Sequence, residues 1–260
     1  MELSSKQIEQ FNKDGYIIFP ELFTSDEIEI FKKEVDRVSK IRSEMVVREG
    51  EDEAVKIMFQ LHEENVETAS PPFRTAARSP RILRTAQQCL GDEELYLHHS
   101  KLNMKSAIEG SAWPWHQDFH SWHLDGIKQP EMVTVTVVLT EASPINGCMY
   151  VLPGSHKQGR SDPRWDDSTA YKLWVAKTSD MKEYMKKFSA PVPITGGAGT
   201  TAIFHCNLLH ASGHNLSSED RWQIFFCFNK CSNRPVDVEN PRPEYVLSLI
   251  HISEPTRQPC

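Results

Sequence analysis

The chain has 260 residues, enough for one large β-rich domain or two small ones, and its 39% hydrophobic and 25% charged residues are ordinary for a globular protein. A formal net charge of −7 provides no electrostatic footprint for nucleic acid or an anionic membrane. No apolar run approaches the roughly 20 residues needed to span a bilayer, and no signal peptide is recognisable. Six scattered cysteines are typical of a reduced protein, so we expect a cytoplasmic location.

The N-terminal third is predicted to be mainly helical. Helices are expected over 4–14 and 25–40, and the second has a capping residue at Ser25 and apolar residues at helical spacing. A turn and a short buried strand over 16–20 separate them. The charged segment 44–60 is predicted to be a mobile surface loop, and a further helix is expected over 81–90.

The remainder is predicted to be β-rich. Strands are expected over 95–105, 132–139, 148–152, 199–204 and 221–228, and Asn146-Gly147 is typical of a hairpin turn. Residues 157–190 are interpreted as an insertion over the mouth of a barrel. Many short strands with turns between them predict a mainly β fold with flanking α-helices, a double-sheet jelly roll, in a single domain over 1–245.

His116 and Asp118 form the first candidate metal motif. In an extended backbone, residues i and i+2 project to the same face, so this imidazole and this carboxylate point together. One further ligand completes a 2-His-1-carboxylate triad, which holds non-haem Fe(II) and leaves open positions. The alternative is a polar strand edge with a solvated Asp118.

A second motif far along the chain favours the metal interpretation. His210 follows the strand expected over 199–204 and is the candidate third ligand. Arg221 comes eleven residues later; its alternative reading is a surface cation on a strand. The close pair Cys227 and Cys231 is interpreted as two thiols at a strand end rather than as a zinc site.

Several motifs in the same order resemble the phytanoyl-CoA dioxygenase (PhyH) family. They are Asp14-Gly15-Tyr16, Trp115-His116-Gln117-Asp118-Phe119, Asn146-Gly147, Pro153-Gly154-Ser155-His156, and His210-Ala211-Ser212 followed by Arg221. The family consists of Fe(II)- and 2-oxoglutarate-dependent oxygenases on a double-stranded β-helix (a jelly roll, cupin-like). Within it, the run from Trp115 to His123 most resembles ectoine hydroxylase.

The resemblance implies roles for particular residues. His116, Asp118 and His210 would be the catalytic iron ligands. Arg221, helped by Ser212, would hold the distal carboxylate of 2-oxoglutarate; further candidates for cosubstrate contacts are Asn103 and, more weakly, Gln117. The cofactors would be Fe(II), 2-oxoglutarate and O2. The chemistry agrees, because a carboxylate needs the planar, permanently charged donor fork that Arg supplies.

The expected substrate is a small, polar, amino-acid-like metabolite that is hydroxylated with release of succinate and CO2. Asp118 predicts oxygenation rather than halogenation, because related halogenases carry a small residue there. Candidate substrate residues are His99, Ser121, Trp122 and His205. Where ectoine hydroxylase has Gln, Glu and Thr, this chain has His99, His120 and Ser121, so the expected substrate face differs.

Several alternatives remain open. The same chemistry could give oxidative cyclisation or desaturation, or an acyl-CoA could bind through a basic entrance built from Lys101, Lys105, Lys157 and Arg160. Alternatives from other classes are an inactive jelly-roll binding module and a zinc hydrolase using the same three ligands. We expect a monomer or homodimer with no nucleic-acid or membrane partner. The tail 246–260 resembles translated sequencing-adaptor sequence and is expected to be non-native and to contribute nothing to the site.

Overall fold

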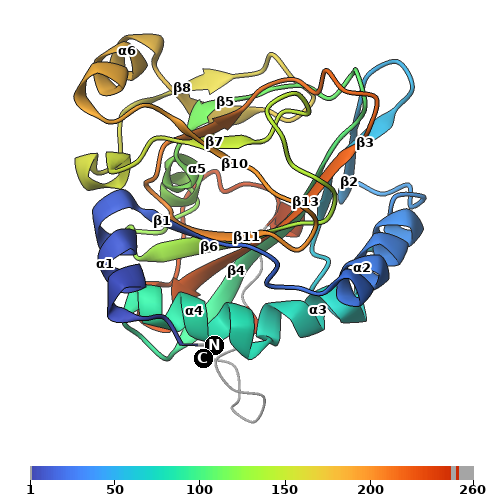
Figure 1. The fold of residues 1–260 in the computed structure, drawn as a ribbon, viewed down its shortest axis with the longest axis horizontal. Coiled ribbons are helices and arrows are strands. Elements are labelled where there is room, and N and C mark those ends of the chain that lie inside the picture. Colours follow the sequence, from blue (N-terminus) through green and yellow to red (C-terminus); the bar gives the residue numbers. More distant parts are fainter. Residues whose placement is uncertain (1, 247–249, 252–260) are drawn as a thin grey trace.

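Two antiparallel sheets face each other in the computed structural model, which describes residues 2–246 and 250–251 (Figure 1). The large sheet has the order β1-β11-β6-β13-β4-β3-β2, with β14 also paired to β4. Its strands are β1 (Tyr16–Phe19), β2 (Val46–Glu49), β3 (Ala54–Phe59), β4 (Leu95–Lys105), β6 (Met132–Val138), β11 (Thr201–His205), β13 (Arg221–Lys230) and β14 (Ile250–His251). The small sheet, of order β10-β7-β12-β5, consists of β5 (Trp113–His116), β7 (Met149–Val151), β10 (Val192–Ile194) and β12 (His210–Ser212).

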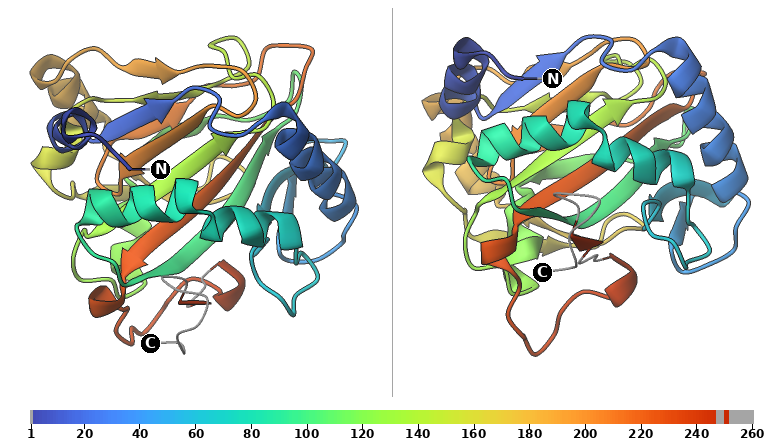
Figure 2. Two further views of the ribbon diagram at one scale, coloured as in Figure 1. Left: turned by 60° about the horizontal axis from the view of Figure 1, so that its bottom comes forward. Right: turned by 90° about the horizontal axis from the view of Figure 1, so that it is seen from below.

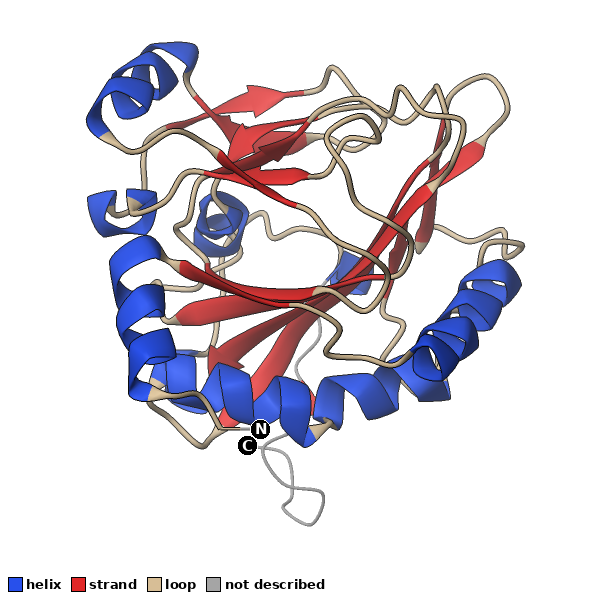
Figure 3. Ribbon diagram, viewed as in Figure 1, coloured by secondary structure: helices blue, strands red, loops and turns tan. Residues whose placement is uncertain are grey.

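Two helices, α3 (Pro71–Arg78) and α4 (Pro80–Leu90), run across the outer face of the large sheet, and two more, α1 (Ser5–Asp14) and α2 (Ser25–Val38), lie at its two ends, as Figures 2 and 3 show. Capping boxes, Ser4 with Gln7 and Thr24 with Glu27, begin α1 and α2 and satisfy free backbone N–H groups, so the cap of α2 is Thr24 and not the expected Ser25. The helices expected over 4–14, 25–40 and 81–90 are therefore confirmed.

The two faces of the large sheet differ in polarity. Along β13, Ile224, Phe226 and Phe228 belong to the main core beneath the helices. The alternate residues Arg221 and Gln223 are also buried, but they line a cavity between the sheets. Alternation at the start of the strand therefore places apolar side chains outward and polar ones inward, and farther along Phe225 also lines the cavity.

Residues 44–60 are not a mobile loop, so that prediction was wrong. They form β2 and β3, antiparallel strands that extend the large sheet through pairing of β3 with β4. Lys56 is 1% exposed, and its Nζ lies 2.7 Å from Glu49 Oε2, so the two charges compensate each other inside the protein. Only the short acidic turn between the strands has the composition of a surface loop.

Asn146-Gly147 lies in a turn, but the turn is not a hairpin, which corrects a second prediction. It connects β6 of the large sheet to β7 of the small sheet, and β7 pairs with β10 and β12 instead. The Asn146 side chain stabilises the turn by accepting from Ser143 N–H at 2.9 Å and donating to Glu141 C=O at 2.9 Å. Turn chemistry was readable from the sequence, whereas sheet membership was not.

The insertion 157–190 contains a separate two-stranded sheet and a helix. These are β8 (Pro163–Asp166), β9 (Leu173–Ala176) and α6 (Thr178–Lys187). Short helical turns occur at Ser155–Gln158, Cys231–Asn233 and Glu244–Val246, and the helix α5 (Asp118–Leu124) follows β5. Within the described ranges, no helix is both long and apolar enough to cross a bilayer. Most of the tail predicted to be non-native, 247–249 and 252–260, lies outside the described residues.

Candidate metal centre

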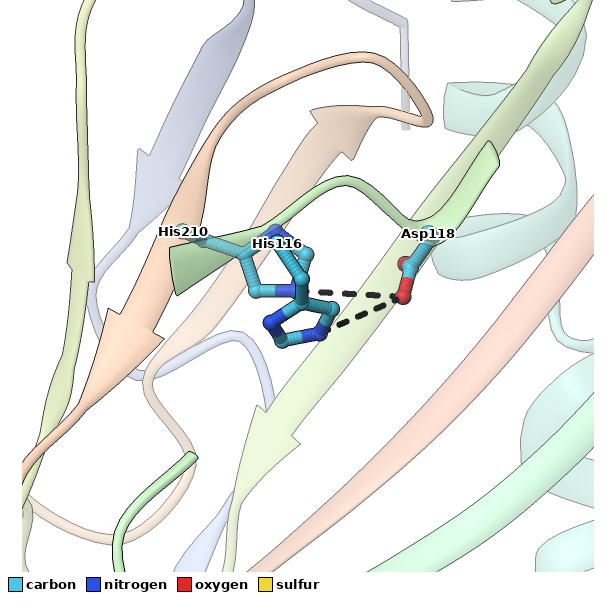
Figure 4. Close-up of side chains that lie close together, drawn as sticks. All are labelled: His116, Asp118 and His210. Carbon is cyan, nitrogen blue, oxygen red and sulfur yellow. Dashed lines mark ion pairs between the residues drawn. The ribbon is translucent and has the colours of Figure 1, made fainter. Parts of the chain in front are cut away.

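His116, Asp118 and His210 converge between the two sheets (Figure 4). His116 ends β5, His210 begins β12, and the antiparallel register pairs these two residues directly. Each imidazole Nε2 approaches Asp118 Oδ1, at 3.9 Å from His116 and 3.8 Å from His210. One ligand atom from each residue lies within 4.8 Å of the others, so a single ion can contact all three. In the part of the chain that the structure describes, this is the one group of at least three such side chains.

Backbone carbonyls fix the orientation of both imidazoles. His116 Nδ1 donates to Pro114 C=O at 2.8 Å, and His210 Nδ1 donates to Leu208 C=O at 3.0 Å. Since Nδ1 carries the proton, Nε2 presents its lone pair toward Asp118. Burial lowers the pKa of His210 and lowers that of His116 further, the latter also because His210 lies close. Both rings are therefore neutral, which is the form that binds metal.

Asp118 stands at a different local position from the one expected. The strand ends at His116, Gln117 is still extended (φ −113°, ψ 133°), and Asp118 is the first residue of α5. Thr134 on β6 donates to Asp118 Oδ2 at 3.1 Å and leaves Oδ1 facing the imidazoles. Burial opposes ionisation of this carboxyl, but its pKa is nevertheless lowered; beside two neutral imidazoles, Lys101 and the hydrogen bond from Thr134 favour the carboxylate. Asp118 is therefore an anion.

A cavity on one side of the triad has the polar groups that a dicarboxylate requires. Asn103, Ser212, Arg221 and Gln223 line it together with the three triad residues. Arg221 is 2% exposed and donates to Gln223 Oε1, but its buried Nε has no partner. Asn103 Oδ1 is likewise buried without one. Buried polar atoms are normally satisfied, so unpaired ones facing a cavity indicate a polar ligand.

A second cavity opens on the other side of Asp118. It shares Lys101, Trp113, His116 and Asp118 with the first. Its remaining lining residues are His99, Ser121, Trp122, Tyr171, Leu173 and Arg242. Three of the four candidate substrate residues, His99, Ser121 and Trp122, therefore lie together here.

Gln117 and His205 line neither cavity, so the structure does not place them with the other candidate contact residues. The Gln117 amide donates to Gly159 C=O and Asn207 C=O and accepts from Ser161 N–H, which anchors a loop instead. His205 Nδ1 accepts from Asn207 N–H at 3.0 Å. Alternation could have excluded Gln117, because the neighbours of an inward-pointing His116 point the other way.

Sequence reasoning missed five polar or charged residues around the two cavities. These are Thr134, Gln223, Tyr171, Arg242 and, as a lining residue rather than part of an entrance, Lys101. The signal available for Gln223 and Lys101 was the alternation of polar and apolar residues along β13 and β4. No sequence pattern indicated Tyr171 or Arg242, since both lie in segments of irregular composition.

Comparisons with known proteins agree with this geometry. The model of the family "Phytanoyl-CoA dioxygenase (PhyH)" matches residues 11–222. The ectoine dioxygenase of Bordetella bronchiseptica is 30% identical over 268 residues, covering 95% of this chain and 82% of that protein. That of Nocardia farcinica is 30% identical over 262 residues, with coverage of 95% and 86%.

Solved structures of one relative match over the same length. A crystal structure of EctD from S. alaskensis with 2-oxoglutarate and 5-hydroxyectoine has a TM-score of 0.80 and 30% identity, covering 94% of this chain and 83% of that one. The same enzyme with bound Fe has a TM-score of 0.79 and 29% identity, with coverage of 94% and 83%. The fold is therefore the double-stranded β-helix of this oxygenase group, as predicted.

The donor set fits the cofactors of these relatives. Two neutral imidazoles and a carboxylate on one ion are the ligands of non-haem Fe(II), and the unpaired polar atoms beside them suit a keto acid with a second carboxylate. The triad, the fold and the matched length identify a 2-oxoglutarate-dependent non-haem iron dioxygenase. The chain belongs to the phytanoyl-CoA dioxygenase (PhyH) family.

Proposed function

We propose that this enzyme hydroxylates an unactivated C–H bond of a small, polar, amino-acid-like metabolite, converting 2-oxoglutarate to succinate and CO2. The observation that carries the proposal is the second cavity, which shares His116 and Asp118 with the cosubstrate cavity. A molecule bound there would lie beside the metal without displacing the cosubstrate. The bound iron would supply the site for O2 and for oxidative decarboxylation of 2-oxoglutarate.

In this proposal, the two ends of 2-oxoglutarate are bound by different groups. The keto acid end chelates the metal held by His116, Asp118 and His210, and the distal carboxylate meets Arg221. Ser212 and Asn103 offer further polar contacts in the same cavity. Gln223 holds the guanidinium in place, because it accepts from Arg221 and donates to Thr136 Oγ1 at 2.8 Å.

In this proposal, cations and aromatic rings of the second cavity bind the substrate. Arg242 is fixed by Asp125, with Nε 2.8 Å from Oδ2, and its Nη1 lies 3.4 Å from the Tyr171 hydroxyl. Lys101 stands between the two cavities, with Nζ 5.2 Å from the centre of the Trp113 ring. These groups suit a substrate carboxylate, while Trp122 and Leu173 offer apolar surface.

The structure gives less support to an acyl-CoA substrate. Of the four cations considered for a phosphate entrance, Lys105 is 1% exposed and is hydrogen bonded within the protein. Lys101 lines the cavities beside the metal rather than an outer rim. A small anionic substrate therefore fits the available charges better. Ectoine itself is not implied, because His99 and Ser121 alter the face that resembles ectoine hydroxylase.

Succinate formation tests the proposed reaction. Purified protein with Fe(II), ascorbate and 2-oxoglutarate is screened against a metabolite library, and products are followed by a mass gain of one oxygen or a loss of two hydrogens. We expect Asp118→Ala to lower substrate-dependent succinate formation at least ~100-fold, because the metal loses its anionic ligand. The matched control Asp162→Ala removes an exposed carboxylate paired with Lys177 and should keep wild-type turnover.

Each other result contradicts a stated part of the proposal. Unchanged turnover in Asp118→Ala would exclude the metal assignment. Activity supported by zinc in the absence of 2-oxoglutarate would point to a hydrolase. A product that has lost two hydrogens without gaining oxygen would replace hydroxylation by cyclisation or desaturation on the same site.

A further inference from the structure

Two buried basic side chains stand directly opposite each other beside the cosubstrate cavity. Lys105 on β4 and Arg221 on β13 are Cα partners in the antiparallel register, and they are 1% and 2% exposed. Like charges at directly opposed positions repel, and burial increases the cost of each charge. Arg221 retains its proton under all ordinary conditions, so Lys105 is the partner that can relieve the repulsion.

The hydrogen bonds of Lys105 are compatible with two protonation states. Its Nζ lies within hydrogen-bond distance of Ser111 C=O, Gly213 C=O and Ser212 Oγ, the last at 2.9 Å. The two carbonyls can only accept and therefore use two N–H groups in either state. Ser212 Oγ can accept a third N–H from the ammonium or donate its own hydrogen to the neutral amine.

This choice sets the direction of the Ser212 hydroxyl. Beside a neutral Lys105, the single hydrogen of Ser212 is used by the amine, and the cavity meets only oxygen lone pairs. Beside the ammonium, the Ser212 hydrogen is free to point into the cavity that Ser212 lines with Arg221. Only the second arrangement offers a donor to a carboxylate.

The charges around Lys105 favour the neutral amine in the absence of an anion. Burial lowers the pKa of Lys105 to about 6, with Arg221 and Lys56 acting in the same direction. Glu49 acts oppositely, but its carboxylate is shared with Lys56 at 2.7 Å. Cys148, the remaining group facing Lys105, has a pKa raised by burial and stays a neutral thiol.

We propose that Lys105 is a positioning residue that takes up a proton when a dicarboxylate occupies the Arg221 end of the cavity, and that this proton turns the Ser212 hydroxyl toward the bound carboxylate. The inference rests on the proposed binding of 2-oxoglutarate in this cavity. The proton moves from solvent to Nζ, and no covalent bond other than N–H forms. Lys105 itself does not line the cavity, so it acts through Ser212.

Isothermal titration of 2-oxoglutarate into the Mn(II)-loaded enzyme at pH 7.5 measures the linked proton. Titrations in buffers of different ionisation enthalpy give the number of protons taken up, and we expect a value approaching one. Affinity should then fall by up to about tenfold for each pH unit above the free pKa of Lys105. In Lys105→Met we expect no proton uptake and a flat pH profile.

Lys101→Met is the matched control, because it removes a cation from the same strand that has no contact with Ser212. It should retain the proton uptake whatever its affinity. If the variant Lys105→Met fails to fold, the wild type alone can test the inference. Its affinity for 2-oxoglutarate is compared with its affinity for 2-oxopentanoate, which has the same chain length without the distal carboxylate. The preference for 2-oxoglutarate over 2-oxopentanoate should shrink by up to about tenfold per pH unit above about pH 6.

The outcomes separate this inference from the proposed function. No binding of 2-oxoglutarate by the wild type would overturn the proposed function itself. Binding without proton uptake, or equal uptake in Lys105→Met and wild type, would overturn the role of Lys105 alone. A preference for 2-oxoglutarate that does not vary with pH would do the same.

Discussion

The outer and inner faces of the large sheet use the same strands for different purposes. On the outer face, Leu102, Ile224 and Phe226 pack beneath the helices in the main core. On the inner face, the alternate residues of the same strands include Asn103 and Arg221, which are equally hidden from solvent. Burial is therefore similar on the two faces, whereas the chemistry that it encloses is not.

The difference shows where stability and ligand binding are located. Apolar burial on the outer face stabilises the fold by about 25 cal/mol for each Å² removed from water. Desolvation of Arg221 and Lys105 on the inner face is unfavourable until an anion compensates it. The fold therefore carries a costly polar face that a bound dicarboxylate would stabilise. Substitutions on the two faces should separate these effects.

The largest effect on stability is expected on the outer face, from Phe226→Ala. This side chain is fully buried in the main core, and its truncation should lower the free energy of unfolding by about 3–5 kcal/mol. Denaturant unfolding measures the loss, and Phe226→Leu should cost less. The affinity of the remaining folded protein for 2-oxoglutarate should stay near the wild-type value; a large loss of affinity would mean that the faces are not separable.

Arg221→Met should give the opposite pattern. We expect the dissociation constant of 2-oxoglutarate to rise at least about 30-fold, equivalent to ~2 kcal/mol, because the charged fork is lost. Unfolding free energy should stay the same or increase, since a buried cation without an anion is removed. Calorimetry measures the dissociation constant and denaturant unfolding measures the free energy of unfolding, both on one preparation. Full recovery of affinity in Arg221→Lys would argue against a planar two-bond contact.

Thr134→Val should have the smallest effect of these substitutions. The prediction compares two ends of the inner face, the end that would bind the metal and the end that would bind 2-oxoglutarate. Losing the hydrogen bond to Asp118 Oδ2 should weaken metal binding about tenfold, as measured by Fe(II) or Co(II) titration. Thr136→Val is the matched control on the same strand, because Thr136 accepts from Gln223 and should alter 2-oxoglutarate affinity instead. Equal metal affinities in both variants and wild type would remove the role assigned to Thr134.

The helices and strands with strong periodicity were predictable, and the hairpin over 44–60 was not. Its charged turn dominated the sequence pattern, but Glu49 and Lys56 form a buried pair that also contacts Ser111 from a distant loop. A charge can be buried when its partner is fixed nearby, and the position of the partner is a property of the folded chain. The local sequence therefore favoured solvent exposure for a segment that the fold encloses.

The candidate site was likewise predictable only in part. The spacing of His116 and Asp118, the distant His210 and the ordered family motifs predicted a metal triad that the structure brings together. Gln117 and His205 lie outside both cavities. For Gln117, adjacency in sequence to two ligands does not imply that its side chain faces the same cavity. Asp118 reaches the metal position from the first turn of a helix, not from a continuous strand.

The sequence by itself determined the reaction class, because residue types and their order define which ions and cosubstrates can be bound. It also determined the helical and β-rich halves, because hydrophobic periodicity is a local property. Only the tertiary structure decided that β4 and β13 place Lys105 opposite Arg221, and that Tyr171 and Arg242 line one cavity with His116 and Asp118. Register between strands and contacts between distant loops depend on how the whole chain excludes water, and no short segment encodes them.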